Sequence, residues 1–83
     1  MTKNNKKTRV DDASTLRANF AFRRESLQLR QSDIAERAGV SREFVSMVES
    51  GIRVPTLAVL SKLAEALETS SAALLTPDYF SDT

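Results

Sequence analysis

The segment QSDIAERAGVSREFVSMVES, residues 31–50, decides the fold of this 83-residue chain. Its apolar residues recur at helical spacing on both sides of Gly39, and glycine is the residue best able to adopt the left-handed conformation that ends a helix. Ser41 follows two residues later as a good N-cap for a second helix. The segment therefore predicts two short helices joined by a turn of three or four residues.

Two helices joined by so short a turn cross steeply, and their backbones come close at the crossing. Ala35 supplies the small residue that such a crossing requires. Further apolar side chains support the turn; they are Ile34, Ala38, Val40, Val45 and Val48. The combination is typical of a helix-turn-helix, although an ordinary helical hairpin without a nucleic-acid role satisfies the same packing.

The flanking sequence predicts two longer helices around this pair. The first covers about residues 13–27, with Leu16, Phe20 and Leu27 on one stripe. Beyond the pair, Pro55 keeps the chain extended and Thr56 caps another helix. The apolar residues of that helix are Leu57, Leu60, Leu63, Ala64 and Leu67.

A short last helix is expected near the C-terminus. Ser70 or Ser71 caps it, it passes through Leu74 and Leu75, and Pro77 closes it. No stretch alternates apolar and polar residues as a strand does. The sequence therefore predicts an all-α domain of five helices.

The composition excludes several kinds of chemistry. The chain contains no Cys and no His, which removes disulfides, thiolate nucleophiles, imidazole bases and the usual zinc sites. We expect no metal and no cofactor. No apolar run approaches the ~20 residues that span a bilayer, and residues 1–10 lack the apolar core of a secretory signal. The chain is therefore expected to be cytoplasmic, without contact to a membrane.

Charge is distributed unevenly along the chain, although the net charge is only +1. The first ten residues hold four basic side chains and no acidic one, whereas Lys62 is the only basic residue from Val54 onward. Residues 1–12 therefore predict a flexible basic arm that adds sequence-independent affinity for a duplex. A disordered solubilising tail is an equally good interpretation.

Arg24 and Glu49 are charged residues on stripes that are otherwise apolar. Arg24 falls on the stripe of Leu16 and Phe20, and Glu49 lies on the core side of its helix. Because an unpaired buried charge is very costly, the two are predicted to form a structural ion pair between their helices.

Three segments in this order resemble the DNA-binding domain of the phage lambda repressor and Cro family, also called the XRE family. They are LRQSDIAERAGVS, VSMVESGIRVPTL and LSKLAEALETS. The resemblance implies a five-helix lambda repressor-like DNA-binding domain over residues 13–77 and a repressor-type transcription regulator. It also implies a homodimer on a near-palindromic operator. The sequence departs from the family at Arg23, where an apolar residue is usual, and at Arg30, where Ser or Thr usually caps the helix.

In a helix-turn-helix the second helix of the pair presents its N-terminal residues to base edges in the major groove. The base-contacting residues expected here are Ser41, Arg42, Glu43, Ser46 and Met47. Arg42 is the strongest candidate because a guanidinium can bridge guanine O6 and N7. Glu43 could accept a hydrogen bond from a cytosine amine, or it could hold Arg42 in place.

Four residues are expected to contact the DNA backbone: Gln31, Arg30, Ser50 and Arg53. Gln31 opens its helix, where a side-chain amide and free backbone N–H groups can meet a phosphate. In the related family this glutamine either contacts the backbone or props a side chain of the recognition helix.

The C-terminal end is more apolar than a five-helix core of this size requires. Leu74, Leu75, Tyr79 and Phe80 are therefore the predicted dimer interface, with residues 78–83 as a tail that joins it. Tyr79 and Phe80 could instead fold back onto their own core.

Two alternative functions compete with DNA-binding regulation. An enzyme is not expected, because no nucleophile motif and no phosphate-binding loop is present. The other alternative is a protein-binding role on the same fold, as an antitoxin with a toxin partner or as an adaptor. A small-molecule effector is not expected, since 83 residues leave no room for a separate sensing domain.

Overall fold

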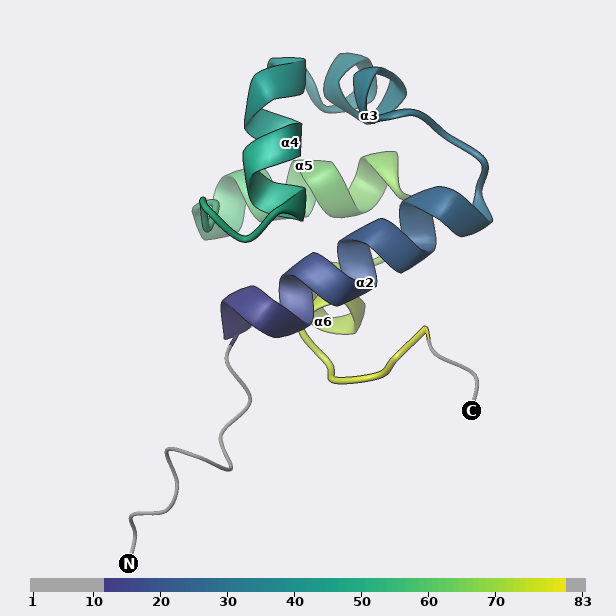
Figure 1. Ribbon diagram of the computed structural model, residues 1–83, viewed down its shortest axis with the longest axis vertical. Helices are drawn as coiled ribbons and strands as arrows, with labels where there is room; N and C mark the ends of the chain where they lie inside the picture. Colours follow the sequence, from purple (N-terminus) through teal and green to yellow (C-terminus); the bar gives the residue numbers. More distant parts are fainter. Residues whose placement is uncertain (1–11, 81–83) are drawn as a thin grey trace, which may run out of the picture.

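The computed structural model describes residues 12–80, which form five helices and no strand (Figure 1). The helices are α2 (Asp12–Ser26), α3 (Gln31–Ala38), α4 (Arg42–Glu49), α5 (Leu57–Ala66) and α6 (Ser71–Leu74). The predicted all-α fold of five helices is therefore confirmed. Apart from Asp12, the predicted basic arm lies outside the described residues, and so do residues 81–83 of the predicted tail.

The residues predicted to start and stop helices do so by local hydrogen bonds. Gly39 ends α3 in the left-handed conformation, with φ of +73°. Ser41, Thr56 and Ser70 each accept the backbone N–H three residues on, at 3.0, 3.3 and 3.0 Å. Between the two candidates for the last cap, Ser70 therefore holds the position.

The first helix ends one residue earlier than the pattern predicts. It stops at Ser26, so that Leu27 lies half-buried in the following turn. Gln28 next to it has φ of +60°, in the left-handed region that terminates a helix. The short connection to α3 follows from that turn.

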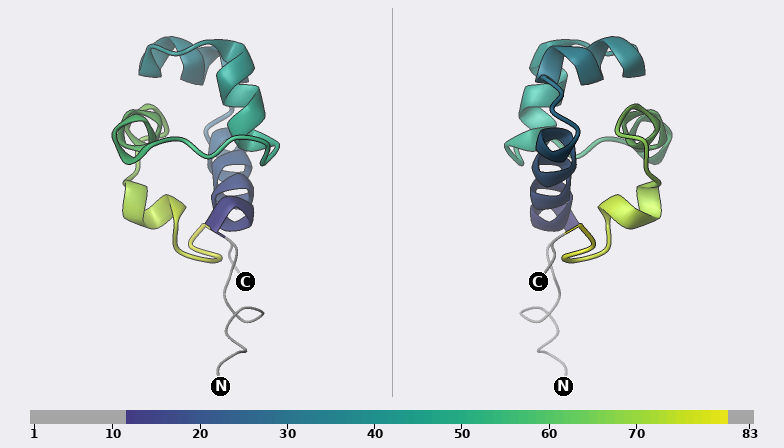
Figure 2. Two further views of the ribbon diagram at one scale, coloured as in Figure 1. Left: turned by 90° about the vertical axis from the view of Figure 1, so that its left-hand side faces the viewer. Right: turned by 90° about the vertical axis from the view of Figure 1, so that its right-hand side faces the viewer.

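The core lies between two layers of helices. Figure 2 shows α2 and α4 on one side and α5 and α6 on the other, with α3 across one end. The largest fully buried side chains are Leu16, Phe20, Ile34, Val45, Val48, Leu63, Leu67 and Leu74. They come from all five helices, so the helix-turn-helix is part of the same core as the helices around it.

Two arginines from other helices stabilise the end of α5, which has no basic residue in its own last turn. Arg23 of α2 donates to the Leu67 carbonyl at 2.9 Å, and Arg37 of α3 donates to the Ala66 carbonyl at 3.0 Å. Cations at this position satisfy free carbonyls and the negative end of the helix dipole. Arg23 thus packs α2 against α5 by hydrogen bonds, where the family usually has an apolar contact.

Asn19 ties the C-terminal segment to α2. Its side chain is buried, and its Nδ2 donates to the carbonyls of Ala73, Leu74 and Thr76 at 3.3, 2.9 and 2.8 Å. The Ala73 and Thr76 carbonyls also accept the backbone N–H groups of Thr76 and Tyr79, whereas Asn19 is the donor to the Leu74 carbonyl at the end of α6. The short α6 therefore depends on a tertiary contact.

Candidate nucleic-acid interface

The two helices of the predicted motif cross over small and apolar residues. Ala35 of α3 is buried at 5% exposure, and Val45 and Val48 of α4 are buried against it and its neighbours. This packing assigns one side of α4 to the core and leaves the other side at the surface. The surface side begins at Ser41, where the chain enters α4.

The five residues predicted to contact bases lie on this surface side. Ser41, Arg42 and Glu43 are exposed, and Ser46 and Met47 are half-buried. The Ser41 hydroxyl already accepts the N–H of Phe44, so towards a ligand it has a proton to donate. The arrangement offers one cation, one anion, two hydroxyls and one apolar side chain within two helical turns.

A continuous chain of hydrogen bonds links the start of α4 to α2. Arg42 donates from Nη1 to Gln31 Oε1 at 3.3 Å, and Gln31 Nε2 donates to Glu49 Oε1 at 3.2 Å. Both functional ends of the Gln31 amide are therefore used, which sets its orientation. The family resemblance offered two roles for Gln31, a contact to the DNA backbone or support of a recognition-helix side chain, and the structure shows that the supported side chain is Arg42.

Arg24 and Glu49 complete this chain of hydrogen bonds. Arg24 donates from Nε and Nη2 to the two carboxylate oxygens of Glu49 at 2.9 and 2.7 Å, a bidentate pair. The two side chains are only 16% and 11% exposed, and Arg24 Nη1 donates to the Leu29 carbonyl. The hydrogen bond to Glu49 raises the pKa of Arg24 further above its usual range. The pair joins α2 to the end of α4.

Glu43 does not hold Arg42 in place, which was one of the two roles predicted for it. In the part of the chain that the structure describes, Gln31 and not Glu43 is the partner of the Arg42 guanidinium. Glu43 is exposed and forms no hydrogen bond or ion pair within residues 12–80. Its carboxylate therefore faces solvent beside Arg42.

Arg30 and Asp33 replace the usual cap of α3. The Asp33 carboxylate accepts the backbone N–H of Arg30 at 2.8 Å and pairs with its guanidinium at 3.3 Å. An arginine side chain has no acceptor, so it cannot supply the bond that a Ser or Thr hydroxyl provides. The guanidinium hydrogen bond, followed by the backbone one, holds the pKa of Asp33 below its usual value. Arg30 itself is 82% exposed and accessible to a ligand.

The other two predicted backbone contacts flank the end of α4. Ser50 is exposed and donates its hydroxyl to the Met47 carbonyl at 3.2 Å. Arg53 is exposed, and its guanidinium carbon lies 5.7 Å from the centre of the Phe44 ring, at cation–π distance. Arg53 therefore folds back along α4 towards its N-terminal half.

The prediction that Leu74 belongs to the dimer interface is wrong. Leu74 is completely buried in the core of its own chain, because α6 packs this side chain inward against α2 and α5. Phe80 packs against the same core and lies 5.5 Å from the Arg23 guanidinium carbon. Leu75 and Tyr79 remain at the surface, at 37% and 57% exposure.

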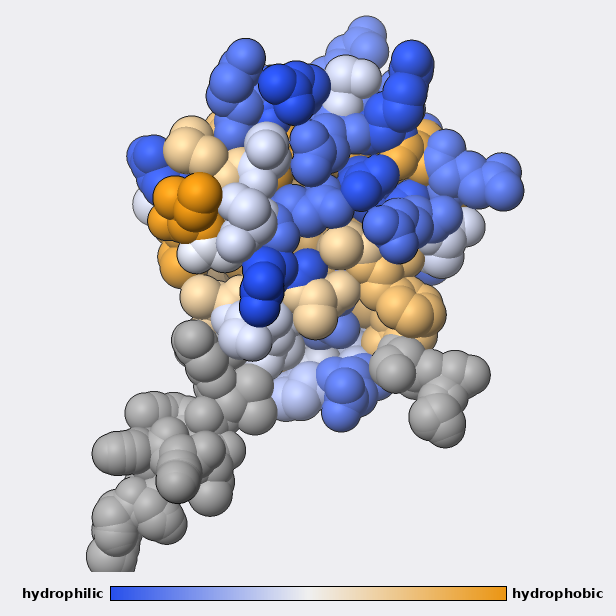
Figure 3. Space-filling model, viewed as in Figure 1, coloured by the Kyte–Doolittle hydropathy of each residue, from blue (hydrophilic) through white to orange (hydrophobic). Residues whose placement is uncertain are grey.

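A more exposed apolar surface lies elsewhere, at the connection between α4 and α5. We call it the 52–57 surface; it consists of Ile52, Val54 and Leu57, at 74%, 61% and 73% exposure. Figure 3 shows apolar side chains at this edge of the molecule. The feature of the sequence that could have indicated this surface is the uncharged segment VPTLAVLS, residues 54–61. It was missed because periodicity alone assigned Leu57 to the buried face of its helix.

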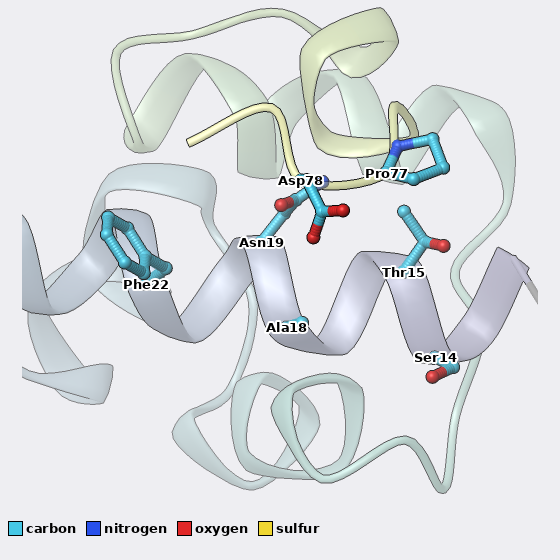
Figure 4. A pocket seen from close by; sticks show the side chains of 7 residues that line it. All are labelled: Ser14, Thr15, Ala18, Asn19, Phe22, Pro77 and Asp78. Atoms are coloured by element: carbon cyan, nitrogen blue, oxygen red, sulfur yellow. The ribbon is translucent and has the colours of Figure 1, made fainter. Parts of the chain in front are cut away.

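A groove between α2 and the C-terminal segment lies apart from α4 (Figure 4). It has a volume of about 380 Å³, and its lining residues are Ser14, Thr15, Ala18, Asn19, Phe22, Pro77 and Asp78. Residues 12–80 contain no group of acidic side chains placed to hold a metal ion. Within the same range, no helix has the length and apolar character needed to cross a membrane.

A five-helix core with a helix-turn-helix whose second helix presents Arg42 at its exposed start is typical of a DNA-binding transcription regulator. A family model described as helix-turn-helix matches residues 21–74, from the middle of α2 to the end of α6. The chain therefore belongs to the XRE-type, lambda repressor/Cro-like family of helix-turn-helix regulators, as its sequence motifs predict.

Individual relatives agree with this assignment. An uncharacterized HTH-type transcriptional regulator of Sinorhizobium fredii is 37% identical over 68 residues, covering 82% of this chain and 88% of that protein. A similarly named regulator of Mycobacterium tuberculosis is 43% identical over 51 residues, covering 61% of this chain and 36% of its own length. The crystal structure of a hypothetical transcription factor from Neisseria superimposes with a TM-score of 0.77 at 30% identity, covering 81% of this chain and 77% of that one.

Proposed function

We propose that this chain recognises a specific double-stranded DNA sequence by placing α4 in the major groove, as a homodimer on a near-palindromic operator. The observation that carries the proposal is the orientation of Arg42 at the exposed start of α4. Its guanidinium is held by Gln31, which is itself held by Glu49. A side chain that is already oriented loses less conformational entropy when it binds, so it discriminates well between bases.

Arg42 is proposed to read guanine through O6 and N7, the acceptors that suit a guanidinium fork. Glu43 is proposed to accept a hydrogen bond from cytosine N4, since its carboxylate has no partner in residues 12–80. Ser41 and Ser46 provide hydroxyls for polar base edges, and Met47 provides an apolar contact for a thymine methyl group. The exposure of this face supports these roles.

The DNA backbone is proposed to lie against both ends of the helix pair. Gln31 and Arg30 stand at the start of α3, where backbone N–H groups also favour an anion. Ser50 and Arg53 stand just beyond the end of α4. Arg30 and Arg53 are exposed cations, so each can neutralise one phosphate.

The 52–57 surface supports the proposed homodimer. Large apolar side chains at this exposure usually mark an interface. A two-fold contact brings like residues close to each other, so charges near the axis would repel. The charge inside the 52–57 surface is that of Arg53, which turns back towards Phe44 of α4, and residues 54–61 carry none, so this segment is suited to such a contact. Leu75 and Tyr79 are the residues of the predicted C-terminal interface that remain exposed. They form the alternative surface for dimer contact.

The proposal is tested by selecting binding sites from random duplex DNA. We expect a two-fold symmetric site with half-site centres about one helical turn, ~34 Å, apart. Arg42→Ala should relax the preference at one position in each half-site, with a loss of about 1–3 kcal/mol of discrimination. Lys62→Ala, which removes an exposed cation from α5, is the matched control and should leave the selected site unchanged.

Two results would contradict the proposal. The first is a selection in which no sequence is enriched, which would leave the antitoxin or adaptor role on this fold. The second is an Arg42→Ala protein that selects the same site as the wild type, since base reading would then reside elsewhere.

A further inference from the structure

One arginine of α2 has no partner within the described residues. Arg23 donates to the Leu67 carbonyl, and Arg24 is bound by Glu49. Arg17 is exposed and forms no hydrogen bond or ion pair within residues 12–80. Because Arg24 already neutralises Glu49, the charge of Arg17 is in excess at the end of α4.

The position of Arg17 is set by the turn after α4. A Cβ atom at Gly51 would lie 3.2 Å from Arg17 Cδ, so the glycine lets the arginine stem lie directly across the turn. Here α2 and the turn form a small, open pocket of about 140 Å³, lined by Ala13, Ser14, Arg17, Ser50 and Gly51. Arg17 is the charged residue of this lining.

The donors in this pocket suit an anion. The Ser50 hydroxyl is used for the Met47 carbonyl, and the Gly51 N–H is used for the Val48 carbonyl. Arg17 and the exposed hydroxyl of Ser14 remain to bind a ligand. Among the lining residues that the structure describes, Arg17 carries a positive charge and none is acidic, which favours an anion.

The pocket also has a suitable place relative to the proposed base contacts. Arg42 begins α4 and Ser50 ends it, which at 1.5 Å per residue separates them by about 12 Å. The major groove is itself about 12 Å wide. When the start of α4 meets the base edges, its other end therefore reaches the border of the groove, where a phosphate strand runs.

We propose that Arg17 binds a phosphodiester of the DNA backbone at this border, with Ser14 as a second donor. This inference rests on the proposed function, since it needs α4 in the major groove. It adds a contact from α2 to those from the helix pair. Because phosphate contacts carry no base information, Arg17 supplies affinity and register but no sequence preference.

The test compares the salt dependence of DNA binding in Arg17→Gln, which keeps a stem over Gly51, with that of wild-type protein. We expect the slope of log K against log salt to fall by about 0.9 for each bound copy, the value for one lost phosphate contact on B-DNA. Affinity should fall by the same factor on the selected operator and on random duplex, and Arg17→Lys should restore the slope. Lys62→Gln makes the same charge change on α5 and should leave the slope unchanged.

Each outcome has a definite meaning. An Arg17→Gln protein with the wild-type slope and affinity overturns the phosphate contact while leaving base recognition by α4 intact. A loss confined to the selected operator also overturns it, because that pattern belongs to base reading. If wild-type protein selects no DNA sequence, the proposed function itself fails. That selection uses wild-type protein alone, so its result does not depend on the Arg17 variants. Circular dichroism of the variants checks that the fold is retained.

Discussion

Replacing Glu49 with leucine would leave the Arg24 guanidinium, at 16% exposure, with the Leu29 carbonyl and the exposed Glu25 carboxylate 3.8 Å away. Two hydrogen bonds between charged groups, at 2.9 and 2.7 Å, are lost. At about 1.5–3 kcal/mol each they amount to about 3–6 kcal/mol. Breaking one partner of a buried pair typically costs about 3–5 kcal/mol. We expect about 3 kcal/mol, because the small exposure of both groups lets water replace part of the interaction.

The matching change, Arg24→Met, should cost a similar amount because it leaves the Glu49 carboxylate with Gln31 alone. The double variant leaves no unpaired charge, so it should cost no more than either single change. The expected coupling is therefore at least about 3 kcal/mol. It is a large fraction of the stability of a small domain, which is typically about 5–15 kcal/mol.

Urea unfolding of the four proteins measures this coupling, with stability taken from the midpoint at constant slope. The Arg30–Asp33 pair is a suitable control, since at 82% and 28% exposure its cycle should give a much smaller coupling. If the effects of Arg24→Met and Glu49→Leu add to within about 0.5 kcal/mol, the two residues do not act as a pair. The structural role given to them here would then be refuted.

Two further predictions concern stability. Asn19→Ala should cost about 2 kcal/mol, because carbonyls at the end of α6 lose a buried donor, and amide hydrogens of residues 75–80 should exchange faster; unchanged exchange there would contradict the role of Asn19. The pKa of Asp33 is lowered below 3.8, first by the Arg30 guanidinium, so its contribution to stability is complete at neutral pH and is lost as the pH falls below 3.8 through the folded value. Asp33→Asn should therefore be less sensitive to acid in urea titrations at pH 3 to 7, and equal sensitivity of the two proteins would refute this.

The elements of the fold were predictable because their boundaries depend on neighbouring residues. A left-handed glycine at Gly39 and hydroxyl caps at Ser41 and Thr56 act within a few positions along the chain. The three sequence segments that resemble the family lie in these same helices, within residues 21–74 that the family model matches, so the family too could be predicted from the sequence. The exception, the early end of α2, arose at Gln28, whose left-handed conformation is uncommon for a residue with a side chain.

The face of each helix that meets solvent was less predictable. Leu57 and Leu74 both fit an apolar helical stripe, yet Leu57 is 73% exposed and Leu74 is fully buried. Periodicity shows which residues of a helix form an apolar stripe, but it does not show which part of that stripe the neighbouring helices cover. Leu57 opens α5 at the edge of the molecule, whereas Leu74 lies where α6 contacts α2 and α5.

By itself, then, the sequence of residues 31–50 determined that two helices meet at Gly39 and which side of the second one faces outward. These features follow from backbone preference and from the spacing of apolar residues. Only the tertiary structure decided which residue holds Arg42, since the sequence left both Gln31 and Glu43 as candidates and the bonds from Gln31 to Arg42 and Glu49 join two helices. Hydrogen bonds over such separations depend on how the helices pack, which no local pattern records.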